Sequence, residues 1–116
     1  MNQQSDFTDD RPLYEIKANL FKGLAHPVRV RILEVLSAAD EVAVSTLIDD
    51  TGLEASHLSQ HLSVLRRHNL VVADRRASQV YYRLAFPEVA ELLTSARAVL
   101  VEVLHHTSRH LDGATR

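Results

Sequence analysis

The segment from Val44 to Leu84 limits the fold of this 116-residue chain more strongly than any other part of the sequence. It contains two short helical patterns joined by a turn at Gly52, and an arginine-rich pair of β-strand patterns follows directly. A polar helix followed by a basic hairpin is typical of domains that insert one helix into the major groove of DNA. The chain is long enough for one such domain with a modest hydrophobic core.

Hydrophobic periodicity predicts the element order α-α-α-α-β-β-α, which is a mainly α-helical fold with a small β-hairpin. The expected helices span about residues 12–24, 27–39, 45–51, 54–69 and 87–111, and the expected strands span 70–75 and 80–84. We expect Gly52 and Asn69 to end the third and fourth helices in a left-handed conformation. Residues 12–111 then form one domain, and the polar segments 1–11 and 112–116 are expected to be disordered tails.

The composition excludes several classes of protein. The sequence contains no cysteine, so disulfides, thiolate metal sites and cysteine redox switches are all excluded. The N-terminal segment is polar and acidic, and it lacks the apolar region of a signal peptide. No apolar run approaches the length that spans a membrane. We therefore expect a cytoplasmic protein with no membrane partner.

Charge is unevenly distributed along the chain. The formal net charge of −2 argues, at first sight, against a nucleic-acid partner. Residues 54–84, however, include five arginines and only two acidic residues. A basic region on an otherwise acidic protein is typical of a surface that binds a polyanion.

The predicted helix at 54–68 has an apolar side and a polar side. At about 100° per residue, Leu58, Leu62 and Leu65 project together toward the core. The other sides carry hydroxyl, amide, imidazole and guanidinium groups, which belong to Ser56, His57, Ser59, Gln60, Ser63, Arg66 and Arg67. Gln can pair with adenine, Arg with guanine, and Ser with bases or phosphates. An ordinary solvated face favours Glu and Lys, and residues 55–68 contain neither, so the pattern favours DNA.

Two adjacent arginines, Arg75 and Arg76, lie near the tip of the predicted hairpin. A two-stranded ribbon can carry such residues to the sugar-phosphate backbone or to the adjacent minor groove. Charge also protects edge strands from aggregation, but that role does not explain why the charges share one sign. We predict that the DNA backbone is bound by Arg66, Arg75 and Arg76, and that the major groove is bound by Ser56, His57, Ser59, Gln60, Ser63 and Arg67.

Two histidines of the same helix have other interpretations. His57 and His61 are four residues apart, a spacing that can chelate a metal ion, but no third ligand lies nearby in the sequence. His61 projects beside the apolar stripe, so we expect a half-buried, hydrogen-bonded side chain rather than a base contact. We therefore predict no metal site at this pair.

Three blocks of the sequence occur in the order and spacing of a known family. Residues 20–33 are LFKGLAHPVRVRIL, residues 59–66 are SQHLSVLR, and residues 80–84 are VYYRL. They resemble the LFKALAHPxRxxIL, SxHLxxLR and VYYxL motifs of ArsR/SmtB-type winged helix-turn-helix repressors, and the likeness covers about residues 13–105. The resemblance implies a transcriptional repressor that is released from DNA by a signal. It also implies a homodimer, formed through the first and last helices, that binds a pseudo-palindromic operator in double-stranded DNA.

The chain departs from this family at its metal sites. Members that sense thiophilic metals have cysteines near the start of the third helix, and residues 42–45 contain none. The ligand positions of a second family site, on the last helix, fall here on Phe86, Glu88, Val99 and Glu102. That second site is at best half present, so neither sensor of the family is predicted.

Two further departures affect local backbone structure. The glycine that is usual at the tip of the wing is replaced by Ala77, so we expect Ser78 or Gln79 to take the strained turn conformation. Glu54 stands before the polar helix, where a Ser or Thr N-cap is common.

Alternative functions remain open at this point. Glu102, His106 and His110 follow one another at four-residue intervals, so they could present metal ligands on one helical face. Histidines near a helix C-terminus are also explained by the helix dipole. The alternatives are thus a metal-sensing repressor and a dimeric winged-helix module for protein contact. No nucleophile, zinc-protease or phosphate-loop motif occurs, so we expect neither an enzyme nor a cofactor.

Overall fold

The computed structural model describes the backbone of residues 10–114 and the side chains of residues 10–110. In chain order its elements are α1 (Leu13–Leu24), α2 (Pro27–Ser37), β1 (Val42–Ala43), α3 (Val44–Thr51), α4 (Ala55–Arg67), β2 (Val71–Arg76), β3 (Gln79–Leu84) and α5 (Glu88–Ala114). The predicted mainly α-helical class is confirmed. Apart from the end of α5, helix and strand ends lie within about two residues of the predicted positions.

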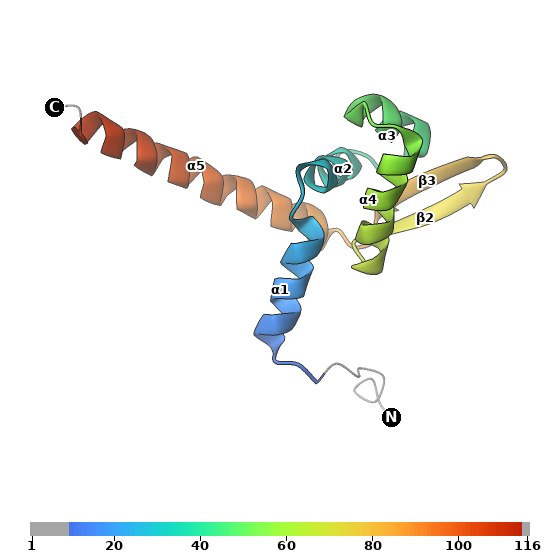
Figure 1. Cartoon of the computed structure of the whole chain (residues 1–116), viewed down its shortest axis with the longest axis horizontal. Helices are drawn as coiled ribbons and strands as arrows, with labels where there is room; N and C mark the ends of the chain where they lie inside the picture. Colours follow the sequence, from blue (N-terminus) through green and yellow to red (C-terminus); the bar gives the residue numbers. More distant parts are fainter. Residues whose placement is uncertain (1–9, 115–116) are drawn as a thin grey trace.

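The body of the molecule consists of α2, α3, α4 and the sheet, while α5 projects away from it (Figure 1). Six side chains in this body are fully buried, namely Ile32, Leu33, Leu36, Leu47, Leu58 and Leu65. Burial of each one stabilises the fold by about 1.5–3 kcal/mol before conformational entropy is counted. Leu62 is 3% exposed, so the predicted inward stripe of α4 is confirmed.

The turn between α3 and α4 depends on the backbone conformation of Gly52. Its φ is 70°, and its amide donates a hydrogen bond to the carbonyl of Ile48 at 2.9 Å. A Cβ at this position would meet no atom within 4 Å, so the requirement for glycine is conformational rather than steric. Asn69, after α4, has a φ of 60°. Both predicted left-handed helix ends are therefore confirmed.

The sheet contains one strand that the sequence pattern did not predict. Val42 and Ala43 of β1 pair with Tyr82 and Tyr81 of β3, which makes β3 the central strand in the order β1-β3-β2. A two-residue strand is too short to show alternation, and its pairing depends on a segment far along the chain. Local periodicity therefore could not reveal β1.

We call the β2–β3 hairpin the wing; its turn is formed by Ala77 and Ser78. Ala77 has a φ of 56°, so the prediction that Ser78 or Gln79 would take the strained conformation is wrong. A positive φ at the first of two turn residues is the pattern of a type II′ turn, whose twist suits a hairpin. The strain falls on Ala77 because the hairpin register fixes which residue occupies that turn position.

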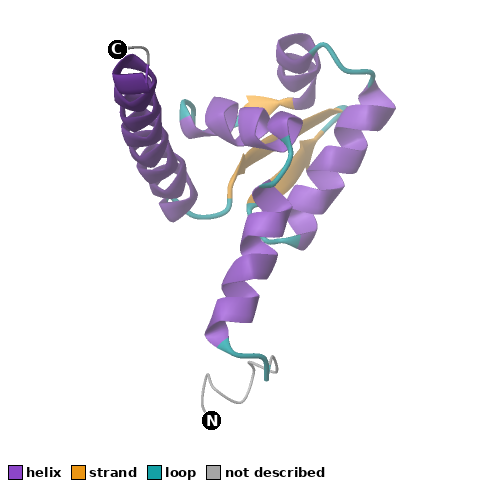
Figure 2. Cartoon of the chain, turned by 60° about the vertical axis from the view of Figure 1, so that its left-hand side comes forward, coloured by secondary structure: helices purple, strands orange, loops and turns teal. Residues whose placement is uncertain are grey.

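α1 and α5 expose an unusually large apolar surface. The exposed large hydrophobic side chains of the described region all belong to α1, to α5 or to the segment just before α5: Leu13, Tyr14, Phe21, Phe86, Val99, Leu100, Val101, Val103 and Leu104. The Cα radius of gyration is 17.9 Å, whereas a compact domain of this length has one of about 13 Å. Much of α5 therefore has no cover from the other described elements (Figure 2).

The described backbone of α5 continues to Ala114, three residues past the predicted domain boundary at residue 111. Gly113 weakens a helix by about 1 kcal/mol but does not by itself end one. Residues 1–9 and 115–116 of the predicted tails lie outside the described residues. Within the described range, no helix combines the length and the apolar character needed to cross a membrane.

Candidate nucleic-acid interface

α4 presents its polar side to solvent. Of the predicted contacts on this helix, Ser63 is half-buried, and the exposed ones are Ser56, His57, Ser59, Gln60, Arg66 and Arg67. Among the described residues, no hydrogen bond or ion pair occupies the side chains of Gln60, Arg66 and Arg67. These donors and acceptors are therefore available to a ligand.

The start of α4 lacks a side-chain cap. Glu54 is the N-cap residue, with a φ of −67° and a ψ of 153°, and its side chain makes no capping hydrogen bond. Its carboxylate still lies near the positive end of the helix dipole, which favours negative charge there. The departure from the usual Ser or Thr leaves the helix formed but removes one hydrogen bond from its first turn.

An arginine fork holds α3 against α2. Arg31 donates from Nε and Nη2 to the two carboxylate oxygens of Asp50, each at 2.9 Å. This pairing raises the pKa of Arg31 and lowers the pKa of Asp50. A two-bond contact fixes orientation as well as distance. The fork helps to orient the first helix of the helix-turn-helix, which the fully buried Leu47 anchors in the core.

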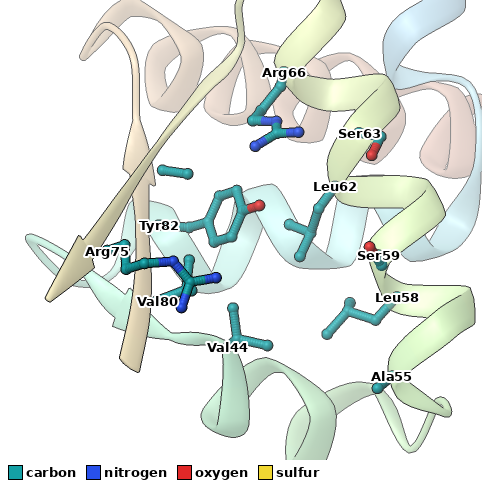
Figure 3. Close-up of a pocket in the computed structure, with 11 residues that line it drawn as sticks. Val44, Ala55, Leu58, Ser59, Leu62, Ser63, Arg66, Arg75, Val80 and Tyr82 are labelled. Atoms are coloured by element: carbon teal, nitrogen blue, oxygen red, sulfur yellow. The ribbon is translucent and has the colours of Figure 1, made fainter. Parts of the chain in front are cut away.

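Strand alternation gives the wing two different faces. Ala73 pairs with Tyr82 and Arg75 pairs with Val80, so these four side chains share one face of the hairpin. Figure 3 shows that this face is turned toward α4. Arg75 therefore lies between the wing and the polar helix.

A groove of about 480 Å³ separates α4 from the wing (Figure 3). We call it the wing groove. Its floor is formed mainly by apolar side chains, among them Val44, Leu58, Leu62, Val80 and Tyr82. Four predicted DNA contacts also line it, and these are Ser59, Ser63, Arg66 and Arg75. The structure thus brings predicted DNA contacts of α4 and of the wing together in one groove.

Arg76 lies on the other face of the wing. Its guanidinium pairs with Glu41, approaches Asp74 at 3.4 Å, and stacks over the ring of Tyr81 at 3.9 Å from the centroid. The hydrogen bond from Arg76 lowers the pKa of Glu41, and the charge of Arg83 adds to the effect. The DNA contact of Arg76 stays a prediction, and any phosphate would have to compete with these acidic partners.

His61 joins α4 to the start of α2. Its ring lies 4.3 Å from the ring of His26, and its Nδ1 is 3.4 Å from Nη1 of Arg29. Arg29 is itself fixed, because it donates to the carbonyls of Gly23 at 2.7 Å and Lys22 at 3.2 Å. The predicted half-buried, hydrogen-bonded position of His61 is confirmed.

The surroundings of His61 favour its neutral form. Burial lowers the pKa of His61, and the nearby His26, Arg29 and His57 lower it further. Arginine can only donate hydrogen bonds, so Nδ1 must accept from Arg29 and the ring proton lies on Nε2. A second proton would place an N–H against the guanidinium of Arg29.

The described residues of a single chain bring no three metal-ligating side chains together. Glu102, His106 and His110 lie along the exposed part of α5, as their spacing predicts.

Tyr82 is a groove residue that the sequence analysis did not single out. Its side chain is 7% exposed, and its ring forms part of the floor between Arg66 and Arg75. The signal was present in the alternation of β3, which puts Tyr82 on the same face as Val80. The orientation of that face could not be known before the hairpin was packed against α4.

Comparisons with known proteins agree with this geometry. A family model described as a helix-turn-helix domain matches residues 24–74. The HTH-type transcriptional regulator Rv0081 of Mycobacterium tuberculosis is 50% identical over 96 residues, which cover 83% of this chain and 84% of that protein. The crystal structure of Rv0081 matches with a TM-score of 0.78 at 48% identity, over 85% of this chain and 99% of that chain.

Two more distant relatives carry fuller descriptions. The solution structure of Mb0332 from Mycobacterium bovis is that of a homodimeric winged helix-turn-helix DNA-binding domain from a possible ArsR-family regulator. It matches with a TM-score of 0.74 at 34% identity, over 85% of this chain and 93% of that chain. The biofilm growth-associated repressor of Xylella fastidiosa is 37% identical over 78 residues, or 67% of this chain and 68% of that protein.

These relatives are transcriptional regulators rather than enzymes. The match to Rv0081 is long enough to include the helix-turn-helix and the wing, which form the candidate interface described above. The chain belongs to the ArsR-type family of winged helix-turn-helix transcriptional regulators.

Proposed function

We propose that this chain is a homodimeric repressor that inserts α4 into the major groove of a pseudo-palindromic operator. The supporting observation is the free polar face of α4 beside the wing. Within the described region, Arg66, Arg67 and Arg75 have no acidic partner. Clustered arginines without partners are suited to the phosphates and base edges of DNA. Because DNA lies in the cytoplasm of the bacterial relatives, we infer a cytoplasmic location.

The predicted contacts divide by their position around α4. Ser56, Gln60 and Arg67 project opposite the buried stripe, so we assign them to base edges. Ser59 and Ser63 line the side that faces the wing, and we keep them as contacts at the edge of the major groove. Arg66 and Arg75, which line the same groove, are assigned to the DNA backbone. His57 lies on the opposite flank, beside His61. Arg76 is assigned a weaker backbone contact because of its ion pair with Glu41.

The apolar faces of α1 and α5 supply the argument for a dimer. Exposed side chains such as Leu100 and Val103 form a stripe that a second copy would cover. A two-fold dimer would present two copies of α4, which suits half-sites about one helical turn of DNA apart. Sedimentation should give a dimer for the wild type, and Leu100→Glu should shift it toward the monomer and weaken operator binding. A monomeric wild type that still binds its operator would exclude the dimer.

The DNA-binding test begins with selection of bound fragments from the source genome, followed by fluorescence anisotropy on one selected and one random duplex. Gln60→Ala should reduce the preference for the selected duplex by about 1–3 kcal/mol. Ser37→Ala at the end of α2 serves as a control, because this exposed hydroxyl bonds only to its own helix, at the carbonyl of Leu33. An equal loss on both duplexes would show that α4 is not the reading helix.

Salt dependence separates this proposal from a module that only binds proteins. Phosphate contacts release counterions, so affinity for any duplex must fall as salt rises. If the protein shifts no duplex even at low salt, the repressor proposal is rejected in favour of protein contact.

A further inference from the structure

We propose that the wing groove binds a small organic anion with an apolar body, such as an aromatic carboxylate, and that this ligand displaces DNA. The binding site is argued from the groove itself. The displacement rests on the proposed DNA-binding function. The groove, with its volume of about 480 Å³, lies between α4 and the wing (Figure 3). It is therefore placed where a ligand would meet both DNA-contacting elements.

An unpaired hydroxyl on a nearly buried ring points to a ligand in this groove. The side chain of Tyr82 is 7% exposed, and among the described residues its hydroxyl has no hydrogen-bond partner. Every described side-chain polar atom that is sealed from solvent has a hydrogen-bond partner. The hydroxyl of Tyr82 has none, so it is not sealed from solvent and borders the open groove. Figure 3 shows it turned across the groove toward α4. A nearly buried phenol that can bond only into a groove is suited to an acceptor on a bound molecule.

Two arginines supply the charge for an anion. Arg66 extends from α4 and Arg75 from β2, so their guanidinium groups reach the groove from opposite walls. Neither group has an acidic partner within the described residues, whereas Arg76, outside the groove, is paired. Guanidinium groups favour carboxylate and phosphate oxygens, with which they form two parallel hydrogen bonds.

The apolar floor distinguishes this ligand from DNA. A phosphodiester can reach the guanidinium groups at the rim, but it offers nothing to cover Val44, Leu62 and Val80 beneath them. A molecule with an anionic head and an apolar body satisfies both parts of the groove. The anion would occupy Arg66 and Arg75, which the DNA backbone also needs. Binding of the two is thus mutually exclusive, and the regulator would be released from its operator.

Calorimetric titration with 2-naphthoate tests the site on the full-length protein. Two further probes test separately whether the groove requires a negative charge and an apolar body in its ligand. 2-Naphthamide lacks the charge, and inorganic phosphate lacks the apolar body. We expect 2-naphthoate to bind at least about tenfold more tightly than either. The proposal is overturned if 2-naphthoate does not bind, or if the amide or phosphate binds as tightly as 2-naphthoate does.

Matched variants locate the binding. Tyr82→Phe should weaken 2-naphthoate about tenfold, the effect of one lost hydrogen bond, whereas Tyr81→Phe on the outer face should not. Arg66→Gln should weaken it by about tenfold or more, whereas Arg83→Gln should not. Arg66 is exposed, so its replacement leaves the core intact even if Tyr82→Phe folds poorly. Binding that neither variant affects would place the ligand elsewhere and overturn the proposal.

Competition on the selected duplex tests the displacement. Saturating 2-naphthoate should weaken operator binding at least about tenfold in the wild type and less in Tyr82→Phe. If the ligand binds through Tyr82 but DNA affinity does not change, the displacement is rejected and the binding site stands. If the wild type binds no duplex at all, the proposed DNA-binding function fails. The calorimetric titration then still decides whether the groove binds the organic anion.

Discussion

Arg75 and Arg76 are adjacent on β2, yet they lie on opposite faces of the wing. Arg75 lines the groove beside α4, whereas Arg76 stacks on Tyr81 and pairs with Glu41 on the other face. Successive side chains of a strand point to opposite faces, so adjacency in sequence separates the two guanidinium groups in space. The basic patch inferred from the sequence therefore contains arginines with different partners.

This relationship predicts unequal effects of two identical substitutions. Arg75→Gln should weaken binding to selected and random duplexes alike, because it removes a proposed contact with the DNA backbone. The slope of log affinity against log salt concentration should become shallower by about one. Arg76→Gln should have the smaller effect, since its guanidinium is already paired with Glu41. Anisotropy titrations over a range of salt concentrations measure both quantities. A larger loss for Arg76→Gln would mean that the ion pair opens when DNA binds.

Gly23 and His68 make a second pair with a measurable consequence. A Cβ on Gly23 would lie 2.6 Å from Cγ of His68 and 3.0 Å from its Cβ. Replacing glycine by alanine inside a helix ordinarily stabilises it by about 0.5–1 kcal/mol. Here the contact includes the Cβ of His68, which rotation of the side chain cannot move, and overpacking costs about 1–3 kcal/mol. Gly23→Ala should therefore lower the free energy of unfolding, measured by urea denaturation.

Removing most of the obstructing side chain should relieve this loss of stability. In a His68→Ala background the 2.6 Å contact with Cγ is gone and only the 3.0 Å contact with Cβ remains, so Gly23→Ala should be much less destabilising there. This explains why the chain has glycine where the family motif LFKALAHP has alanine. All four proteins must be compared at one concentration, because the proposed dimer would contribute to stability. Additive effects of the two substitutions would show that the two residues do not interact.

The helix-turn-helix could be predicted because its information is local. Leu58, Leu62 and Leu65 repeat at helical spacing, and Gly52 and Asn69 have the chemistry of left-handed helix ends. Each of these signals acts over a few residues. Sequence reasoning therefore identified which side of α4 is buried and which is exposed to solvent.

Features that depend on tertiary contacts could not be read in this way. The pairing of Arg76 with Glu41 joins residues from distant segments, as does the contact between Arg29 and His61. Tyr82 appeared only as part of a family motif until the packing of the wing on α4 showed the groove beneath it. Strand alternation fixes which residues share a face, but packing decides what that face meets.

The strained wing tip yields a third prediction. Ala77 has a φ of 56°, and this region costs a residue with a Cβ about 1–2 kcal/mol relative to glycine. Glycine is also more flexible in the unfolded chain, which offsets part of the gain. Ala77→Gly should therefore raise the free energy of unfolding by about 0.5–1 kcal/mol, measured by urea denaturation. Ser78→Gly, at a turn residue whose φ is not positive, is the control and should not stabilise the protein.

His61 predicts a dependence of stability on pH. Burial, together with His26, Arg29 and His57, lowers the pKa of His61 in the folded protein below its ordinary value of 6.5. A lowered folded pKa means that the unfolded chain binds the proton more readily. The contribution of His61 to stability is therefore present above about pH 6.5 and is lost as the pH falls through the folded pKa.

A single substitution isolates this contribution from the other six histidines. His61→Asn does not titrate, and its amide oxygen can accept from Arg29 in place of Nδ1. The wild type should lose more thermal stability between about pH 8 and about pH 5.5 than His61→Asn does. His57→Asn is the matched control, because its side chain is exposed one helical turn away. If His61→Asn and the wild type lose stability equally, the acid sensitivity arises elsewhere, and the contact between α4 and α2 does not depend on the neutral imidazole.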